Sequence, residues 1–242
     1  MVDHKILILG GTGEARALAA LLLEANKNFI SSLAGRTDDP IFPVGPLRIG
    51  GFGGVEGLLA YCRSEKITHI ADCTHPFAAQ ISAHAANVAE QLGLLYLRLE
   101  RPQWEKQAGD NWITVSCMGA AADSLLPGAR VMLTTGLKDL PAFFSRPDIS
   151  GIARMMGAPQ IAAPTGWKIL RERPPLTLES EIALMHAHEI TVLVSKNSGG
   201  KARAKLDAAR ELGLPVVMLA RPAKPAAQIA QKVEELAEML AN

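Results

Sequence analysis

Several short turns in this sequence combine glycine with polar side chains, a composition suited to holding a charged small molecule. The first follows the apolar run Ile6–Leu9 and reads Gly10, Gly11, Thr12, Gly13, Glu14 and Ala15. Glycines let the backbone approach a pyrophosphate, and the N–H groups that open the helix expected over Ala15–Leu23 favour its charge. Ala15 and Arg16 stand where the last glycine of G-x-G-x-x-G would fall. The turn therefore predicts either a dinucleotide site or a plain strand-to-helix connection.

The choice between NAD and NADP is usually made after the second strand, here expected over Phe29–Leu33. In NAD-binding proteins a carboxylate about 20 residues beyond the glycines contacts the ribose 2′-hydroxyl. Arg36 and Thr37 occupy that place here, and a guanidinium can bind a 2′-phosphate through two parallel hydrogen bonds. The sequence predicts NADP, with Asp38 and Asp39 near enough to keep the other interpretation open.

A second glycine cluster, Gly50–Gly54, precedes a helix expected over Val55–Cys62. Gly53 lies in this cluster and is a candidate for close contact with the cofactor. Glycine clusters also form simple loops. The cluster therefore predicts either a contact with the cofactor or substrate, or a loop with no ligand.

A histidine follows the strand expected over Ile67–Ala71, in the turn Cys73-Thr74-His75-Pro76-Phe77. Thr74 in this turn is a candidate cofactor contact. Pro76 fixes the local backbone and is expected in the first turn of the next helix, which would hold His75 toward the ligand. An imidazole there is either a proton donor near neutral pH or a hydrogen-bonding group for a cofactor phosphate or amide. The alternative is a helix-capping turn with an incidental histidine.

The turn Ser195–Gly200 occupies the equivalent place in the second half of the chain. Lys196 supplies a cation, Asn197 both a donor and an acceptor, and Ser198 a helix cap or a ligand contact. A capped turn without a ligand is the alternative. The polarity of the turn favours a binding role.

Short apolar runs rich in β-branched residues alternate with segments of helical period, which predicts an α/β fold. Such runs are apolar on both faces, as in parallel sheets covered by helices on both sides. The expected strands are Ile6–Leu9, Phe29–Leu33, Ile67–Ala71, Leu94–Leu99, Val131–Leu133, Thr191–Val194 and Val216–Leu219. Helical stripes are expected at Ile81, Ala85, Val88 and Leu92, and at Ile229, Val233, Leu236 and Leu240.

The second half of the chain matches the first weakly, at an offset of about 120–125 residues. The order strand, polar turn, helix, strand and Arg-Pro recurs, ending at Arg101-Pro102 and at Arg221-Pro222. The match predicts two Rossmann-like domains with mostly parallel sheets, residues 1–127 for the cofactor and 128–242 for the substrate, with the seam at Pro127-Gly128. Ligands are expected in a cleft where the carboxyl ends of the two sheets face each other.

Composition excludes several classes of protein. Net charge is +1 and 48% of residues are hydrophobic, so neither a basic nucleic-acid surface nor an acidic tail is expected. Cys62, Cys73 and Cys117 lie far apart, which predicts no disulfide framework and no metal site. The residues after Met1 form no signal-like or membrane-spanning apolar run, which predicts a cytoplasmic protein with no membrane partner.

Two other nucleotide-binding enzyme classes lack their signatures. A short-chain dehydrogenase needs Tyr-x-x-x-Lys, but Glu65 follows Tyr61 at that spacing and Glu100 follows Tyr96. The phosphate-binding motif G-x-x-x-x-G-K-[ST] is absent as well. A non-catalytic NADP-sensing module would retain the first glycine turn and Arg36, but it has no need of a polar turn at Lys196.

Taken in order, the turns resemble those of the precorrin-6A reductase family over essentially the whole chain. The segments that carry the resemblance are Gly10–Ala15, Thr74-His-Pro-Phe-Ala78, Arg101-Pro102-x-Trp104, Leu133-Thr-Thr-Gly136 and Ser195–Gly200. The resemblance implies reduction of a macrocycle double bond in precorrin-6A by NADPH, giving precorrin-6B, during corrin ring synthesis. It equally fits the sister enzyme that acts on cobalt-precorrin-6A.

This resemblance assigns roles to the turns. His75 is the leading proton donor, with water or the substrate's own acidic groups as the alternative, and Lys196 is a second candidate catalytic residue. Because the substrate carries many acetate and propionate groups, Gly136, Lys196, Asn197 and Ser198 are expected to bind it. The further candidate cations are Lys138, Arg154 and Arg203. A monomer is expected. Residues 171–176 depart from the family's glycine-rich pattern, which puts substrate contacts from that loop in doubt.

Overall fold

The computed structural model describes residues 4–35, 40–157, 161–172 and 176–241. The chain forms two compact units, residues 1–102 with 222–242, and residues 103–221. Within the described ranges, no helix is long and apolar enough to cross a membrane. The same residues contain no cluster of His, Cys, Asp or Glu able to hold a metal ion.

The first unit contains a six-stranded parallel sheet in the order β12-β5-β4-β1-β2-β3. In chain order its strands are β1 (Lys5–Leu9), β2 (Asn28–Leu33), β3 (Leu47–Ile49), β4 (His69–Asp72), β5 (Leu95–Leu99) and β12 (Gln228–Ala230). Alternate residues of β1 enter different cores: Ile6 and Ile8 pack on one face of the sheet, and Leu7 and Leu9 on the other. The strand is therefore apolar on both faces, as its sequence predicts.

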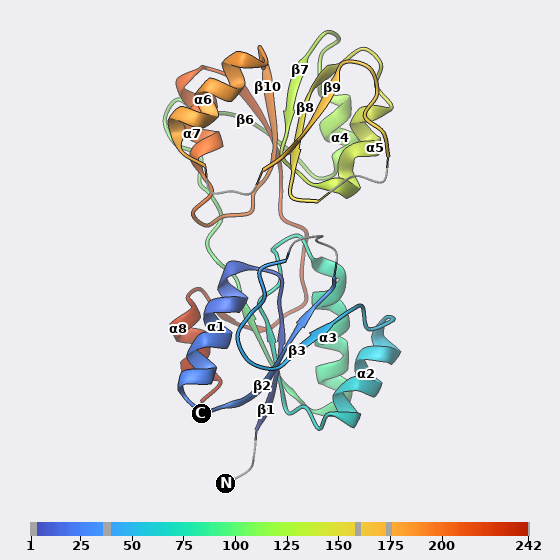
Figure 1. Cartoon of the computed structure of the whole chain (residues 1–242), viewed down its shortest axis with the longest axis vertical. Coiled ribbons are helices and arrows are strands. Elements are labelled where there is room, and N and C mark those ends of the chain that lie inside the picture. The colour runs from blue at the N-terminus through green and yellow to red at the C-terminus, as the bar shows by residue number, and fades with distance from the viewer. Residues whose placement is uncertain (1–3, 36–39, 158–160, 173–175, 242) are drawn as a thin grey trace. The chain divides into compact units, whose positions relative to one another are not determined.

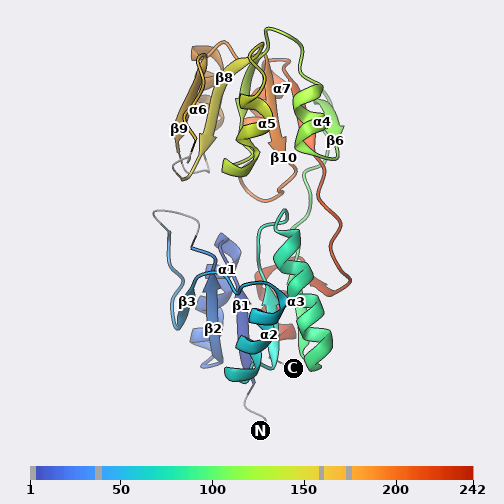
Figure 2. The same cartoon turned by 90° about the vertical axis from the view of Figure 1, so that its right-hand side faces the viewer.

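Helices cover both faces of this sheet. α1 (Gly13–Glu24) and α8 (Val233–Met239) lie on one face, and α2 (Val55–Ser64) and α3 (Ala79–Leu92) on the other, as Figure 1 shows. Figure 2 shows the second pair in front of the sheet. Ala15, Leu18, Ala19 and Leu22 form the apolar stripe of α1, and α8 packs against it.

The second unit repeats this architecture, with its parallel sheet in the order β6-β11-β10-β7-β8-β9. Its strands are β6 (Asn111–Val115), β7 (Arg130–Leu133), β8 (Ser150–Met155), β9 (Trp167–Arg171), β10 (Val192–Lys196) and β11 (Pro215–Leu219). One face carries α4 (Met118–Asp123), the short 3₁₀ helix η1 (Leu137–Asp139) and α5 (Leu140–Phe144). The other carries α6 (Leu178–Ala187) and α7 (Ala204–Glu211). The predicted α/β class with two Rossmann-like sheets is confirmed.

The two units are divided differently from the expected boundary at Pro127-Gly128, which falls inside the second unit. The chain passes between units after Pro102 and after Arg221. β6 and α4 come from the first half of the sequence but belong to the second unit. β12 and α8 come from the second half but belong to the first unit. Each half of the sequence thus gives its last strand and helix to the other unit. Local patterns are the same whichever sheet a strand joins, so the repeat could not reveal this exchange.

The element predictions are confirmed for the seven strands expected from the sequence and need two corrections. Ile229 was expected on the last helical stripe, but it lies in β12 with 46% of its surface exposed. Helix α8 begins only at Val233. Pro76 also lies in a turn before α3, whose first residue is Ala79, rather than in the helix itself.

Candidate functional site

In the first unit, the carboxyl ends of β1 and β4 lie side by side at the point where the strand order reverses. Open α/β sheets bind ligands at this place. The turn after β1 begins with Gly10, whose N–H donates to Ser32 O at 2.9 Å. A Cβ at Gly10 would lie 3.2 Å from a methyl group of Leu33, and Gly11 has a φ of +102°. The backbone of this turn therefore requires glycine at its start.

Thr12 joins the two turns at this point. Its hydroxyl accepts from Ala15 N–H at 3.1 Å, which caps α1, and it donates to Cys73 O at 2.7 Å. The N-terminus of α1, beginning at Gly13, is thereby fixed beside the turn that follows β4. The arrangement provides backbone N–H groups and a helix dipole for an anionic ligand.

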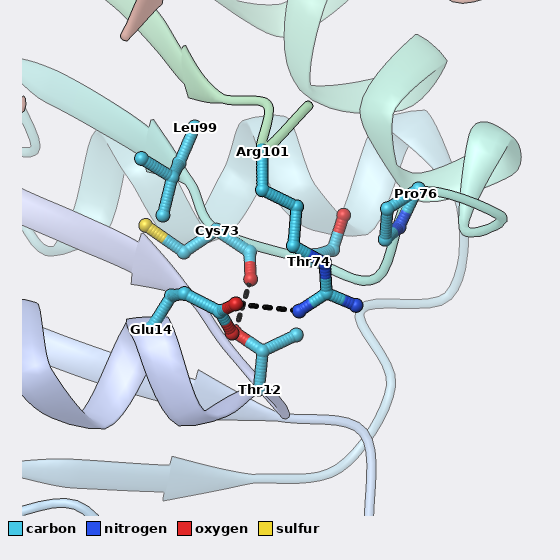
Figure 3. A pocket seen from close by; sticks show the side chains of 7 residues that line it. All are labelled: Thr12, Glu14, Cys73, Thr74, Pro76, Leu99 and Arg101. Carbon is cyan, nitrogen blue, oxygen red and sulfur yellow. Dashed lines mark hydrogen bonds and ion pairs between the residues drawn. The ribbon is translucent and has the colours of Figure 1, made fainter. Parts of the chain in front are cut away.

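Glu14 lies in the first turn of α1 and pairs with Arg101, the two side chains pointing toward one another in Figure 3. The distance between Arg101 Nη1 and Glu14 Oε1 is 2.5 Å. Burial raises the pKa of Glu14, but the hydrogen bond from Arg101 and the helix backbone together leave its pKa below the ordinary value. Glu14 is therefore ionised at neutral pH, and Arg101 compensates its charge.

A small pocket lies beside this ion pair. It is lined by Thr12, Glu14, Cys73, Thr74, Pro76, Leu99 and Arg101. The predicted glycine turn and the predicted Thr74–Pro76 turn are thus neighbours. Cys73 contributes a fully buried thiol whose pKa burial raises well above its ordinary value. It is consequently a structural group here and not a nucleophile.

The turn that carries His75 is held by buried Asp72. One carboxylate oxygen accepts from Thr74 N–H at 3.1 Å and from Thr74 Oγ1 at 2.6 Å, and the other accepts from Tyr96 at 2.9 Å. Thr74, predicted as a cofactor contact, therefore uses its hydroxyl proton within the protein. Sequence reasoning missed Asp72 and Tyr96, because neither lies in a glycine-rich turn.

His75 is exposed on this edge, and its Nδ1 accepts from Phe77 N–H at 3.2 Å. An Nδ1 acceptor corresponds to the neutral tautomer that carries its proton on Nε2. Nε2–H is then a hydrogen-bond donor. Imidazolium would require a proton on Nδ1 and the loss of the Phe77 bond, and the role of His75 stays a prediction.

The second glycine cluster lies beside the end of β2. Arg48 of β3 donates to Gly50 O at 2.5 Å and to Gly51 O at 2.8 Å, and its guanidinium lies 3.9 Å from the centroid of the Phe52 ring. Gly53 has a φ of +80° with open space where a Cβ would lie. Arg36 and Thr37, the predicted contacts for the 2′-phosphate, lie outside the described residues.

The second unit offers the equivalent place at the carboxyl ends of β7 and β10. Lys196, at the end of β10, donates from Nζ to Thr135 O at 2.7 Å and to Asp139 Oδ2 at 2.6 Å. It thereby links the turn after β10 to the turn after β7, as Thr12 links the two turns of the first unit. Gly136 immediately precedes η1 and has a φ of +105°. The hydroxyl of Thr135 is buried with no hydrogen-bond partner among the described residues. A buried hydroxyl of this kind fits a ligand contact.

The other predicted substrate contacts are already engaged within the protein. Asn197 accepts from Trp104 N–H at 2.8 Å and donates to Trp104 O at 3.0 Å, so its amide clamps that backbone instead of facing a ligand. Ser198 N–H and Oγ both contact Lys196 O. Arg154 forms a buried bidentate pair with Glu181, with both distances at 2.8 Å.

The last two candidate cations differ from each other. Arg203 contacts Asp110 at 3.3 Å and Asp207 at 3.1 Å, so its charge is compensated. Lys138 is exposed in η1. Three of the predicted cations, Arg154, Arg203 and Lys196, therefore form ion pairs within the protein.

Comparisons with known proteins agree on one family. The model of the family described as "Precorrin-6x reductase CbiJ/CobK" matches residues 5–241. The chain is 45% identical to precorrin-6A reductase of Rhodococcus erythropolis, covering 98% of this chain and 96% of that protein. It is 30% identical to cobalt-precorrin-6A reductase of Priestia megaterium, covering 98% of each. A solved structure of CobK precorrin-6A reductase superposes with a TM-score of 0.92 at 41% identity, covering 98% of this chain and 96% of that one.

Proposed function

The chain belongs to the precorrin-6x reductase family, and from that membership we propose that it uses NADPH to reduce a macrocycle double bond of precorrin-6A, giving precorrin-6B in corrin ring synthesis. The enzyme is then an oxidoreductase acting on a CH–CH group. The observation that carries the proposal is the capped glycine turn at the carboxyl ends of β1 and β4.

The residues at that turn fit the phosphates of a dinucleotide. Gly10 and Gly11 cannot carry side chains without strain or crowding, and the first N–H groups of α1 supply donors for a pyrophosphate. Gly53 and the Gly50–Gly54 loop are proposed to contact the same cofactor. The carboxylate of Glu14 shares the turn, and Arg101 offsets its repulsion of the phosphates.

The chemistry that NADPH supplies when bound is a hydride for an electron-poor double bond. The protein must hold the reacting partners, exclude water and admit a proton. Asp72 and Tyr96 fix the backbone on which Thr74 and His75 lie. His75 Nε2–H is proposed to hydrogen-bond the cofactor or the substrate. Because Nδ1 accepts from Phe77 N–H, water or an acidic group of the substrate is a better proton source.

Substrate binding is proposed for the turns at the carboxyl ends of β7 and β10. A polycarboxylate macrocycle loses water on binding and needs cations and donors in exchange. Lys196 supplies the cation. Gly136, Ser198 and the hydroxyl of Thr135 are proposed to contact the substrate from the same turns. Asn197 is left out of this proposal, because both polar atoms of its amide hold Trp104.

The cobalt-free substrate is favoured over the cobalt-bearing one by the relatives. Precorrin-6A reductases of R. erythropolis and Mycobacterium tuberculosis are 45% and 48% identical to the chain. Cobalt-precorrin-6A reductases of P. megaterium and Synechocystis are 30% and 28% identical. Steady-state kinetics with both substrates test this choice, and a higher kcat/KM for cobalt-precorrin-6A would reverse it.

Cofactor choice is tested at Arg36. Arg36→Ala should weaken NADPH binding by about 1.5–3 kcal/mol, the scale of a charge-assisted hydrogen bond, and leave NADH binding almost unchanged. Isothermal titration with each cofactor measures this difference. Equal losses for NADPH and NADH would rule Arg36 out as the 2′-phosphate contact.

The role of His75 is tested by a pair of variants. His75→Gln retains a side-chain N–H donor, whereas His75→Ala removes it. A binding role predicts that glutamine keeps kcat within a factor of a few and that alanine raises the Kd or the KM. A loss of roughly 100-fold or more in kcat for both variants, with NADPH affinity retained, would instead make His75 the proton donor.

A further inference from the structure

Lys205 is a cation of the second unit that the sequence motifs did not reveal. It lies in the first turn of α7, which follows the polar turn after β10. Its ammonium lies 5.1 Å from the centroid of the Trp104 ring. Helices that follow strands of a parallel sheet begin at the edge formed by the strands' carboxyl ends, so Lys205 shares that edge with Lys196.

Trp104 is firmly held at this edge. Asn197 bonds its backbone N–H and C=O, at 2.8 and 3.0 Å, and the indole N–H donates to Gly200 O at 2.9 Å. The indole is buried among side chains of the second unit's core. The ring beneath the ammonium is therefore a fixed apolar surface, tied by hydrogen bonds to the turn that follows Lys196.

No acceptor among the residues that the structure describes hydrogen-bonds Lys205 Nζ, and no carboxylate forms an ion pair with it. The neighbouring cations differ in this respect, since Arg154 is bound by Glu181 and Arg203 by Asp110 and Asp207. Lys205 is half-buried, in contrast to exposed Lys138 and Lys201. It thus combines partial desolvation with a charge that no carboxylate among these residues pairs.

The charged groups that face Lys205 come from two other elements. Arg154 at the end of β8 opposes its charge, and Glu181 in the first turn of α6 favours it while remaining committed to Arg154. Burial, with the repulsion of Arg154, lowers the pKa of Lys205 to about 8. The group is still mostly protonated at neutral pH, but it is poorly solvated. A carboxylate bound there would gain a charge-assisted hydrogen bond, with the ammonium already partly stripped of water.

We propose that Lys205 binds a peripheral carboxylate of the substrate, with its ammonium held over the indole of Trp104. The proposal rests on the proposed function, since it names the part of a tetrapyrrole polycarboxylate that this residue recognises. It assigns substrate binding to Lys205 and no step of the chemistry. A bound carboxylate would contact the ground state and the transition state alike, so its loss should appear in KM and not in kcat.

Three variants test the proposal. Lys205→Met removes the charge and keeps most of the apolar stem, Lys205→Arg keeps a charge that does not titrate below about pH 12, and Lys168→Met removes an exposed lysine of β9 as the matched control. We expect Lys205→Met to raise the KM for precorrin-6A roughly tenfold or more, with kcat and the Kd of NADPH nearly unchanged. Lys205→Arg should keep the KM low, and Lys168→Met should resemble the wild type.

The pH dependence of KM separates binding from a purely structural role. The wild-type KM should rise as pH increases through about 8, because the ammonium loses its proton there. Lys205→Arg should abolish this rise. An unchanged KM in Lys205→Met, or the same rise with pH in Lys205→Arg, would overturn the assignment.

Binding of uroporphyrin III, a tetrapyrrole with acetate and propionate groups on every ring, tests Lys205 without turnover. Quenching of tryptophan fluorescence measures it, and Lys205→Met should weaken it roughly tenfold. A wild type that binds uroporphyrin through Lys205 but does not reduce precorrin-6A would refute the proposed function and retain the carboxylate site. Equal uroporphyrin affinity in the wild type and Lys205→Met would refute the site itself.

Discussion

Glu14 places a carboxylate in the first turn of α1, where a pyrophosphate would also bring negative charge. Its partner Arg101 lies 87 residues away in the sequence. Arg101→Met should therefore weaken NADPH binding about 5- to 30-fold, since the uncompensated carboxylate would repel the phosphates. Adding Glu14→Gln to this variant should restore most of the affinity, as measured by fluorescence titration. A double variant as weak as Arg101→Met alone would indicate that Arg101 contacts the cofactor directly.

The cysteines give a second residue-scale prediction. Burial raises the pKa of Cys62 to about 11 and that of fully buried Cys73 well above its ordinary value, whereas Cys117 is exposed. Thiolates, and not thiols, react with disulfide reagents. Native protein should therefore release one equivalent of thionitrobenzoate rapidly from Ellman's reagent, and all three cysteines should react in denaturant. Rapid reaction of Cys73 in the native state would show that the turn after β4 opens in solution.

Residue types in the turns were predictable, but their partners were not. The carboxylates that engage Lys196 and Arg154 lie 57 and 27 residues away, and Asp110, one of the two that engage Arg203, lies 93 residues away. A local motif carries no information on such pairing, so the sequence could not show which predicted cations are matched. Lys205 was missed for the same reason, because its environment depends on Trp104, 101 residues before it.

At the scale of elements, Asn197 ties the turn after β10 to the backbone of Trp104. Asn197→Ala would leave the N–H and C=O of buried Trp104 without partners, and should lower the free energy of unfolding by about 2–4 kcal/mol. Asn197→Asp retains an acceptor for Trp104 N–H and should lose less. Urea titration followed by circular dichroism measures both. Unchanged stability in Asn197→Ala with a raised KM would return Asn197 to the substrate site.

The predicted strands are largely buried, but burial alone does not make a strand predictable. β8 is almost wholly buried and was not predicted, because Gly151 and Arg154 interrupt its apolar run. Central β1 and β4 have almost wholly buried residues, and their apolar runs are unmistakable. β3, β6 and β12 lie at sheet edges or are only three residues long, and many of their side chains are exposed. Ile229 lies in β12, which is too short to show the alternation of a strand, and the spacing of Ile229 with Val233 and Leu236 therefore predicted a helix there.

At the scale of the whole molecule, the exchange of final elements predicts which fragments fold. Residues 103–221 contain a complete sheet with both helical layers. Residues 128–242 lack β6 and α4, and they carry β12 without its partner strand β5 and α8 without α1. The first fragment should unfold cooperatively in urea, and the second should expose apolar surface and aggregate. Cooperative unfolding of residues 128–242 alone would contradict the exchange.

The central claim is that the chain transfers a hydride from NADPH to precorrin-6A. Anaerobic turnover with NADPH deuterated at the transferred C4 position, followed by mass spectrometry of the tetrapyrrole, tests it most directly. The account predicts a product that has gained the mass of one deuterium and one hydrogen. Reaction in deuterium oxide with ordinary NADPH should likewise place one deuterium at the carbon that receives the proton. A tetrapyrrole of unchanged mass, or one reduced without deuterium from the cofactor, would contradict the account.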